Sequence, residues 1–183
     1  MTAPRPSRAR RVLLGLALFL LHGEPPRAQR VDEEQVKAAY VYNFAKFTEW
    51  PANAFMSAND PIRVCVLDDQ PFHSQLMQII RDKRIGDRVV LAVSVQNPEK
   101  ARNCHILFIN STHNVEAARL FESLRGSSVL TVGETESFVD RGGTISFVTQ
   151  DGQVHFQVNH RAATESGIRL SSRLLSVARK VIE

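Results

Sequence analysis

The sequence predicts an α/β protein: a single domain with a mixed central sheet flanked by helices, followed by a C-terminal β-hairpin and a helix. Short runs rich in β-branched residues alternate with helix-like stretches, a pattern typical of helices packed on a parallel or mixed sheet. Asp151-Gly152 then separates two further strand-like runs, which predicts the hairpin. About 155 residues follow an N-terminal export signal, a length that fits one domain.

The first helix is predicted from Asp32 to Thr48. Apolar side chains recur there at spacings of four, four and three, on one helix face: Val36, Tyr40, Phe44 and Phe47. Pro51 ends the helical pattern. Because Tyr42 and Trp50 add two more aromatic rings, the segment is apolar beyond a single stripe, as in a central core helix or an interface.

Four strands are then expected from the β-branched runs: Ile62–Leu67, Arg88–Val95, Cys104–Ile109 and Ser128–Val132. The helix-like stretches between them are Phe72–Arg81 and Val115–Leu124, with a shorter piece at Pro98–Arg102. The strand runs lack polar alternation, as expected when helices cover both faces of a sheet.

With Asp151 and Gly152 as its two loop residues, the hairpin has a fixed register. The facing pairs are Phe147–Phe156 and Ile145–Val158 on one side, and Ser146–Gln157 and Val148–His155 on the other. The first side is expected to be buried and the second to meet water or a partner. Asn159 can cap a helix to Ser166, and Gly167 interrupts it. Helical spacing predicts one further helix through Leu170, Leu174, Val177, Ala178 and Val181.

Residues 1–28 have the features of a cleavable secretory signal. Arginines precede an apolar run of ten residues, Val12–Leu21, which is too short for a membrane-spanning helix, and cleavage is expected near Ala28. The remaining residues 29–183 hold equal numbers of basic and acidic side chains. The high isoelectric point therefore belongs to the signal and is no argument for binding nucleic acid.

Two cysteines, Cys65 and Cys104, lie in the exported part. An oxidising compartment favours a disulfide between them, and two separate buried thiols are the alternative. The bond would close a loop spanning 39 positions, which corresponds to roughly 3 to 4 kcal/mol in the chain-entropy model. The two do not form a Cys-x-x-Cys pair, which argues against redox catalysis.

No pattern in the exported part points to catalysis, a metal ion or a cofactor. Its histidines include no pair at a metal-binding helix spacing: His73, His105, His113, His155 and His160. No nucleophile elbow and no glycine-rich phosphate loop occur. Asp68-Asp69 follows a predicted strand end, where α/β proteins often bind ligands, although carboxylates there more often form turns.

Several short motifs follow one another along the exported part. They are YVYNFAKFTEWP at 40–51, CHILFI at 104–109, VGETESF at 132–138, GGTISF at 142–147, FQVN at 156–159, AA at 162–163, GI at 167–168 and SSRLL at 171–175. Together they resemble the YfiR family of periplasmic regulators over essentially the whole exported part.

The resemblance implies a non-enzymatic periplasmic repressor that needs no cofactor. The founding member of that family binds the periplasmic sensor part of a membrane diguanylate cyclase and holds it inactive, and an outer-membrane lipoprotein can sequester the repressor. Family members form dimers and depend on disulfides, so we expect a homodimer here. No cysteine follows Cys104, so redox control through a second, C-terminal pair is not expected.

A repressor without chemistry needs an exposed patch that prefers one conformation of its target. The candidate partner-binding residues are Phe138, ahead of the hairpin, with His155 and His160. The alternative for Phe138 is a place in the core, where Phe147 and Phe156 are expected. A second hypothesis is an exported module that binds a small ligand or acts on another membrane sensor, such as a histidine kinase. A hydrolase or transferase is the third hypothesis and ranks lowest, because no nucleophile, base and orienting group can be named together.

Overall fold

The computed structural model describes residues 27–111 and 117–183 of the chain. The predicted export signal lies almost wholly outside the described residues, and so does His113. The helical elements are α1 (Arg27–Lys46), η1 (Ala52–Ala54), α2 (Gln70–Ile80), η2 (Pro98–Asn103), α3 (Ala117–Ser123), α4 (Ser137–Asp140), α5 (His160–Glu165) and α6 (Ser172–Val177). The strands are β1 (Thr48–Glu49), β2 (Ile62–Leu67), β3 (Arg84–Ile85), β4 (Arg88–Val95), β5 (Ile106–Ile109), β6 (Leu130–Gly133), β7 (Ile145–Gln150), β8 (Gln153–Asn159), β9 (Arg169–Leu170) and β10 (Lys180–Ile182).

The central sheet is mixed, as predicted. Its eight strands lie in the order β10-β8-β7-β6-β5-β2-β4-β3. The strands from β4 to β7 are all parallel, whereas β8 runs antiparallel to β7 and β3 antiparallel to β4. A separate two-stranded ladder joins β1 to β9, which brings the end of the first helix to the C-terminal third of the chain.

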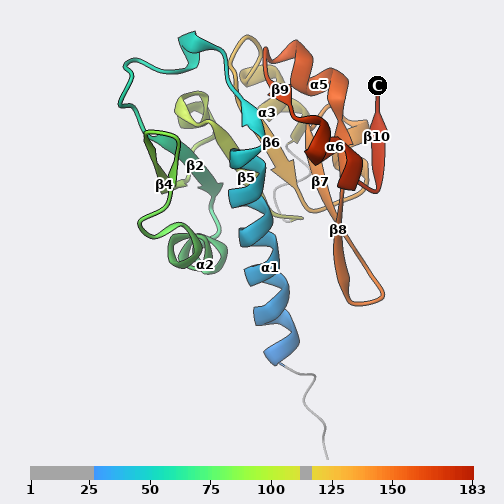
Figure 1. Cartoon of the computed structure of the whole chain (residues 1–183). Coiled ribbons are helices and arrows are strands. Elements are labelled where there is room, and N and C mark those ends of the chain that lie inside the picture. Colours follow the sequence, from blue (N-terminus) through green and yellow to red (C-terminus); the bar gives the residue numbers. More distant parts are fainter. Residues whose placement is uncertain (1–26, 112–116) are drawn as a thin grey trace, which may run out of the picture.

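Helices cover both faces of the sheet, which explains the continuous apolar strand runs. Figure 1 shows α1 lying across one face, with α2 on one side of it and α6 on the other. This face holds the larger core cluster, with Phe44 of α1, Phe72 of α2 and Leu174 of α6. A second cluster on the opposite face packs η2, α3 and α4 against the sheet, with Leu120 and Phe138 among its members.

Helix α1 begins at Arg27, upstream of the predicted start, and ends at Lys46 rather than Thr48. The Thr48 hydroxyl donates a hydrogen bond to the Phe44 carbonyl at 2.7 Å, which satisfies a carbonyl left free in the last helical turn. The chain then enters β1. No helix within residues 27–111 and 117–183 combines the length and apolar character that crossing a membrane requires.

The predicted disulfide is confirmed. Cys65 lies in β2 and Cys104 just before β5, with their Cα atoms 5.9 Å apart. Both belong to the second core cluster and are buried. The bond therefore ties two adjacent strands together inside the domain.

The predicted register of the hairpin is confirmed in every pair, including Phe147 opposite Phe156. The expectation that its second side is open is wrong for Ser146 and Gln157, which are buried. Helix α4 covers this side, and the Ser146 hydroxyl donates a hydrogen bond to the Thr135 carbonyl.

The end of the chain differs from the prediction of one long helix after Gly167. The helix α6 covers only Ser172–Val177, and β10 follows it, pairing with β8 from Lys180 to Ile182. Free backbone groups along the outer edge of β8 offer a hydrogen-bonded ladder to these last residues. Tertiary pairing therefore overrides the helical spacing.

Candidate functional site

Phe138, one of the predicted partner-binding residues, is fully buried, so the expectation that it contributes to an exposed patch is wrong. Its ring packs edge-on against Phe121, with the centroids 5.2 Å apart. A methyl group on Gly133 or Gly143 would collide with the ring. The two glycines therefore make the space that Phe138 fills, and this residue belongs to the core.

The two predicted histidines occupy different places. His155 is half-buried on β8, opposite Val148 in the hairpin. His160 is the first residue of α5, and its Nδ1 lies 3.3 Å from Oε2 of Glu183. His160 also lines a pocket on the surface.

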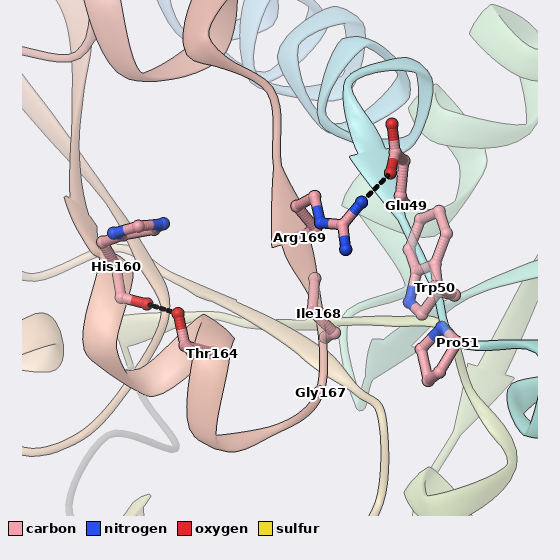
Figure 2. Close-up of a pocket in the computed structure, with 8 residues that line it drawn as sticks. All are labelled: Glu49, Trp50, Pro51, His160, Thr164, Gly167, Ile168 and Arg169. Carbon is pink, nitrogen blue, oxygen red and sulfur yellow. Dashed lines mark hydrogen bonds and ion pairs between the residues drawn. The ribbon is translucent and has the colours of Figure 1, made fainter.

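That pocket is a groove of about 440 Å³. Figure 2 shows His160 and Thr164 of α5 on one side, and Trp50 and Pro51 on the other, with the chain from Gly167 into β9 between them. The Thr164 hydroxyl donates to the His160 carbonyl at 3.0 Å. The walls thus come from two segments that are more than 100 residues apart.

The short β1–β9 ladder holds these two segments together. It pairs Thr48 with Leu170 and Glu49 with Arg169, and the Ser171 amide donates to the Phe47 carbonyl at 2.9 Å. Gly167 ends α5 with a φ of +71°, a left-handed conformation that glycine adopts without strain and that turns the chain back toward β1.

A buried histidine supports the Trp50 wall from below. The Trp50 indole donates to the His105 carbonyl at 3.2 Å, and the two rings meet edge-on. Nδ1 of His105 accepts from the Arg63 amide at 3.0 Å, while Nε2 lies 3.2 Å from the Ala54 carbonyl. Burial, together with the positive charge of Arg63, lowers the pKa of His105 to about 4. The ring is thus neutral at pH 7, with Nε2 as the donor.

The chemistry of the groove suits binding by contact. Ile168 lies between the two walls and is almost fully buried, and the indole ring of Trp50 and the ring of Pro51 add apolar lining beside it. Glu49 and Arg169 form an ion pair at 3.3 Å at the edge, with side chains 73% and 82% exposed. Such an exposed pair contributes little to stability, so its charges can be exchanged with those of a bound partner.

Asp68-Asp69 lies at the carboxyl end of a parallel strand, where α/β proteins often bind ligands, but the polar side chains at this edge make contacts within the fold. Asp69 caps α2 by accepting from the Phe72 amide and also accepts from Asn110. Lys37 bridges Glu33 and Glu134; burial alone would lower the pKa of Lys37, but hydrogen bonds to these carboxylates raise it on balance. Among residues 27–111 and 117–183, no cluster of three His, Cys, Asp or Glu side chains is placed to hold a metal ion.

A family model described as YfiR/HmsC-like matches residues 34–179, which is most of the chain. The chain belongs to this family. The YfiR/HmsC-like family is a regulatory, non-catalytic one, consistent with a periplasmic role in cyclic-di-GMP signalling. The match includes both walls of the groove, and the motifs 40–51 and 167–168 contain Trp50, Pro51, Gly167 and Ile168 of its lining.

One solved structure shares the fold, and a second resembles it more weakly. A conserved domain protein from Vibrio cholerae O1 biovar El Tor is 11% identical, with a TM-score of 0.51 over 79% of this chain and 60% of that one. The ABC domain from Streptococcus pneumoniae, solved in complex with L-Trp, is 13% identical, with a TM-score of 0.49 over 68% of this chain and 55% of that one. The YfiR/HmsC-like chain thus spans little more than half the length of these proteins, and the likeness to the first concerns the fold alone.

Proposed function

We propose that this protein is a non-enzymatic periplasmic regulator that binds the periplasmic sensor domain of an inner-membrane diguanylate cyclase and represses cyclic-di-GMP synthesis. The observation that carries the proposal is membership of the YfiR/HmsC-like family across residues 34–179. The Cys65–Cys104 disulfide supports a location in an oxidising compartment. By the same family argument, an outer-membrane lipoprotein can compete for the protein and relieve repression.

The groove between Trp50 and His160 is the surface through which we expect the target to be held. It combines an aromatic wall, a buried aliphatic side chain and a few polar groups, the composition typical of an interface centre with a polar edge. Repression then follows from preferential binding to the inactive conformation of the cyclase. Moving such an equilibrium from 1:99 to 99:1 takes a preference of about 10⁴-fold, about 5.5 kcal/mol.

The direct test is to delete the gene and measure cellular cyclic-di-GMP, then restore the wild type, His160→Ala or His155→Ala. We expect the deletion to raise the level and the wild type to lower it again. His160→Ala should restore repression poorly because it alters a groove wall, whereas His155→Ala should restore it fully. Thermal unfolding of each purified variant checks that its fold is intact.

The outcomes separate the function from the site. An unchanged cyclic-di-GMP level in the deletion strain would contradict the repressor function for this chain. If His155→Ala loses repression while His160→Ala retains it, the target binds at the hairpin instead of the groove.

The groove volume favours a second candidate, a small-ligand-binding sensor module. About 440 Å³ lies within the roughly 300–1,000 Å³ of small-molecule sites. A thermal-shift screen with metabolites distinguishes the two: stabilisation by one compound, without affinity for a cyclase sensor domain, would favour the ligand-binding module.

A further inference from the structure

Strand β4 has an open outer side over most of its length. Only β3 lies beyond it in the sheet, and β3 pairs with its first residues, Arg88 and Val89. Figure 1 shows β4 at the side of the sheet, beyond β2. From Leu91 to Val95, no strand of the described chain borders this outer side. Such an edge offers its backbone groups to another chain.

The hydrogen bonds of β4 show which of its backbone groups point outward. The Val90 amide donates to the Lys83 carbonyl at 3.1 Å on the outer side, whereas the Val95 carbonyl accepts from the amide that follows β2 at 2.9 Å. Because backbone groups alternate in direction along a strand, Ala92 and Ser94 point outward as Val90 does. Within residues 27–111 and 117–183, no backbone group pairs with these two on the outer side.

The sequence of this edge lacks the features that protect edge strands. Residues 89–95 read VVLAVSV, without a charged residue, a proline or a glycine. Val89 and Leu91 are 36% and 46% exposed, on the face opposite the one where Val90 joins the larger core cluster. Natural proteins usually protect such edges with lysine, proline or a bulge. An uncharged, β-branched edge that stays open is suited to receiving a strand.

We infer that the outer edge of β4 binds an extended segment of another protein, which adds a strand to the sheet and carries carboxylates at the end that reaches Arg81 and Lys83. Ala92 and Ser94 each offer this segment one amide donor and one carbonyl acceptor. Apolar side chains on one face of the segment cover Leu91, which the fold leaves exposed.

The charges beside the edge favour an acidic segment. Four basic residues surround two acidic ones at β3: Arg81, Lys83, Arg84 and Arg88, with Asp82 and Asp87. The guanidinium groups of Arg84 and Arg88 donate to backbone carbonyls. Arg81 and Lys83 are exposed, and in the described part of the chain neither side chain has a carboxylate partner. Carboxylates on an incoming segment would supply that partner and speed its association.

The position of β3 restricts what can occupy the edge. Lys83 takes the place beside Val90, so the occupant must end or turn there. An antiparallel second copy of β4 would bring Gln96 and Asn97 to this point, and neither carries a charge for Arg81. A carboxylate-bearing segment of a different protein therefore fits the edge better than a second copy does.

The edge of β4 is separate from the groove at His160. No residue of β3 or β4 lines that groove. The inference goes beyond the proposed function and does not rest on it, so its failure would leave the proposed function standing.

Binding of synthetic peptides to the chain purified from the periplasm tests the edge, with fluorescence anisotropy as the measurement. The probes are short peptides of alternating valine and threonine with two glutamates, or two lysines, at either end. We expect a glutamate peptide to bind and its lysine counterpart to bind at least about tenfold more weakly, because lysines would meet Arg81 and Lys83. Lys83→Glu should abolish this preference, whereas Lys46→Glu, the same change at an exposed position on α1, should preserve it.

Amide exchange measured by NMR tests the added hydrogen bonds. Bound peptide should slow exchange of the Ala92 and Ser94 amides at least about tenfold and leave Leu91 and Val93, which face β2, unchanged. Ser94→Pro removes one outward amide and should weaken peptide binding, whereas Ser94→Ala keeps the amide and should bind as the wild type does. Thermal unfolding checks that each variant is folded.

Three results would overturn the inference. They are failure of every glutamate peptide to bind, equal affinities of folded Ser94→Pro and Ser94→Ala, and binding that leaves exchange of the Ala92 and Ser94 amides unchanged. A wild type that binds no peptide but dimerises, and that Ser94→Pro makes monomeric, would assign the edge to a second copy instead.

Discussion

Replacing Phe138 by alanine should destabilise the fold rather than remove a contact with a partner. The ring is fully buried between Phe121 and the backbone at Gly133 and Gly143, and the sheet cannot collapse to fill the space it leaves. Truncating a buried phenylalanine costs about 3–5 kcal/mol, which lowers the melting temperature of a domain of this size by roughly 6–20 °C. Urea unfolding followed by circular dichroism measures the loss.

A second substitution tests whether the glycines form the pocket of this ring. Gly143 has a backbone conformation open to other residues, but an added methyl group would collide with Phe138. Gly143→Ala should therefore destabilise the wild type more than it destabilises Phe138→Ala, with a coupling energy of at least about 1 kcal/mol. A loss below about 1 kcal/mol in Phe138→Ala, or equal effects of Gly143→Ala in both backgrounds, would refute this reasoning.

Three further predictions concern the disulfide, the buried histidine and the ion pair at the groove. Replacing Cys65 and Cys104 by serine should lower the free energy of unfolding by about 4 kcal/mol, the chain-entropy value for a sequence separation of 39. A reductant should lower the melting temperature of the wild type alone, and the same effect on the double variant would contradict this prediction. The pKa of His105 is about 4 in the folded chain and 6.5 when unfolded, so the folded state binds fewer protons. The free energy of unfolding should therefore be highest above pH 6.5 and fall by up to about 3 kcal/mol toward pH 4. His105→Gln should make the free energy of unfolding, measured with urea, depend less on pH over this range. Arg169→Ala, which removes the exposed pair with Glu49, should change the free energy of unfolding by less than about 0.5 kcal/mol, and a larger loss would show that the pair holds the β1–β9 ladder.

Local chemistry explains which parts of the fold the sequence predicts well. Asp151 and Gly152 adopt φ values of +52° and +73°, so the two-residue loop sets the hairpin register by itself. The Ile62–Leu67 run matches β2 to the residue, because a strand covered on both faces reads as an unbroken apolar run. The Arg88–Val95 run also matches β4, although Val89 and Leu91 of that strand are exposed, so its β-branched content is the better signal there.

The errors arise where distant segments decide the outcome. Val181 has helical spacing from Leu174, yet it lies in β10 because β8 offers it a pairing edge. Ser146 is buried because α4 folds over it, and a polar side chain gives no local sign of such cover. The same reason hides the candidate groove from the sequence: His160 follows the hairpin and is predicted with it, but the β1–β9 ladder places it near Trp50, which is more than 100 residues earlier.

The sequence separation of the two strands of the β1–β9 ladder also determines when the groove can form during synthesis. Glu49 and Arg169 are 120 positions apart, and the chain is synthesised from its amino end. The Trp50 wall is therefore synthesised first, and the opposite wall follows more than 100 residues later. A nascent or truncated chain that stops before residue 160 therefore lacks one wall of the groove.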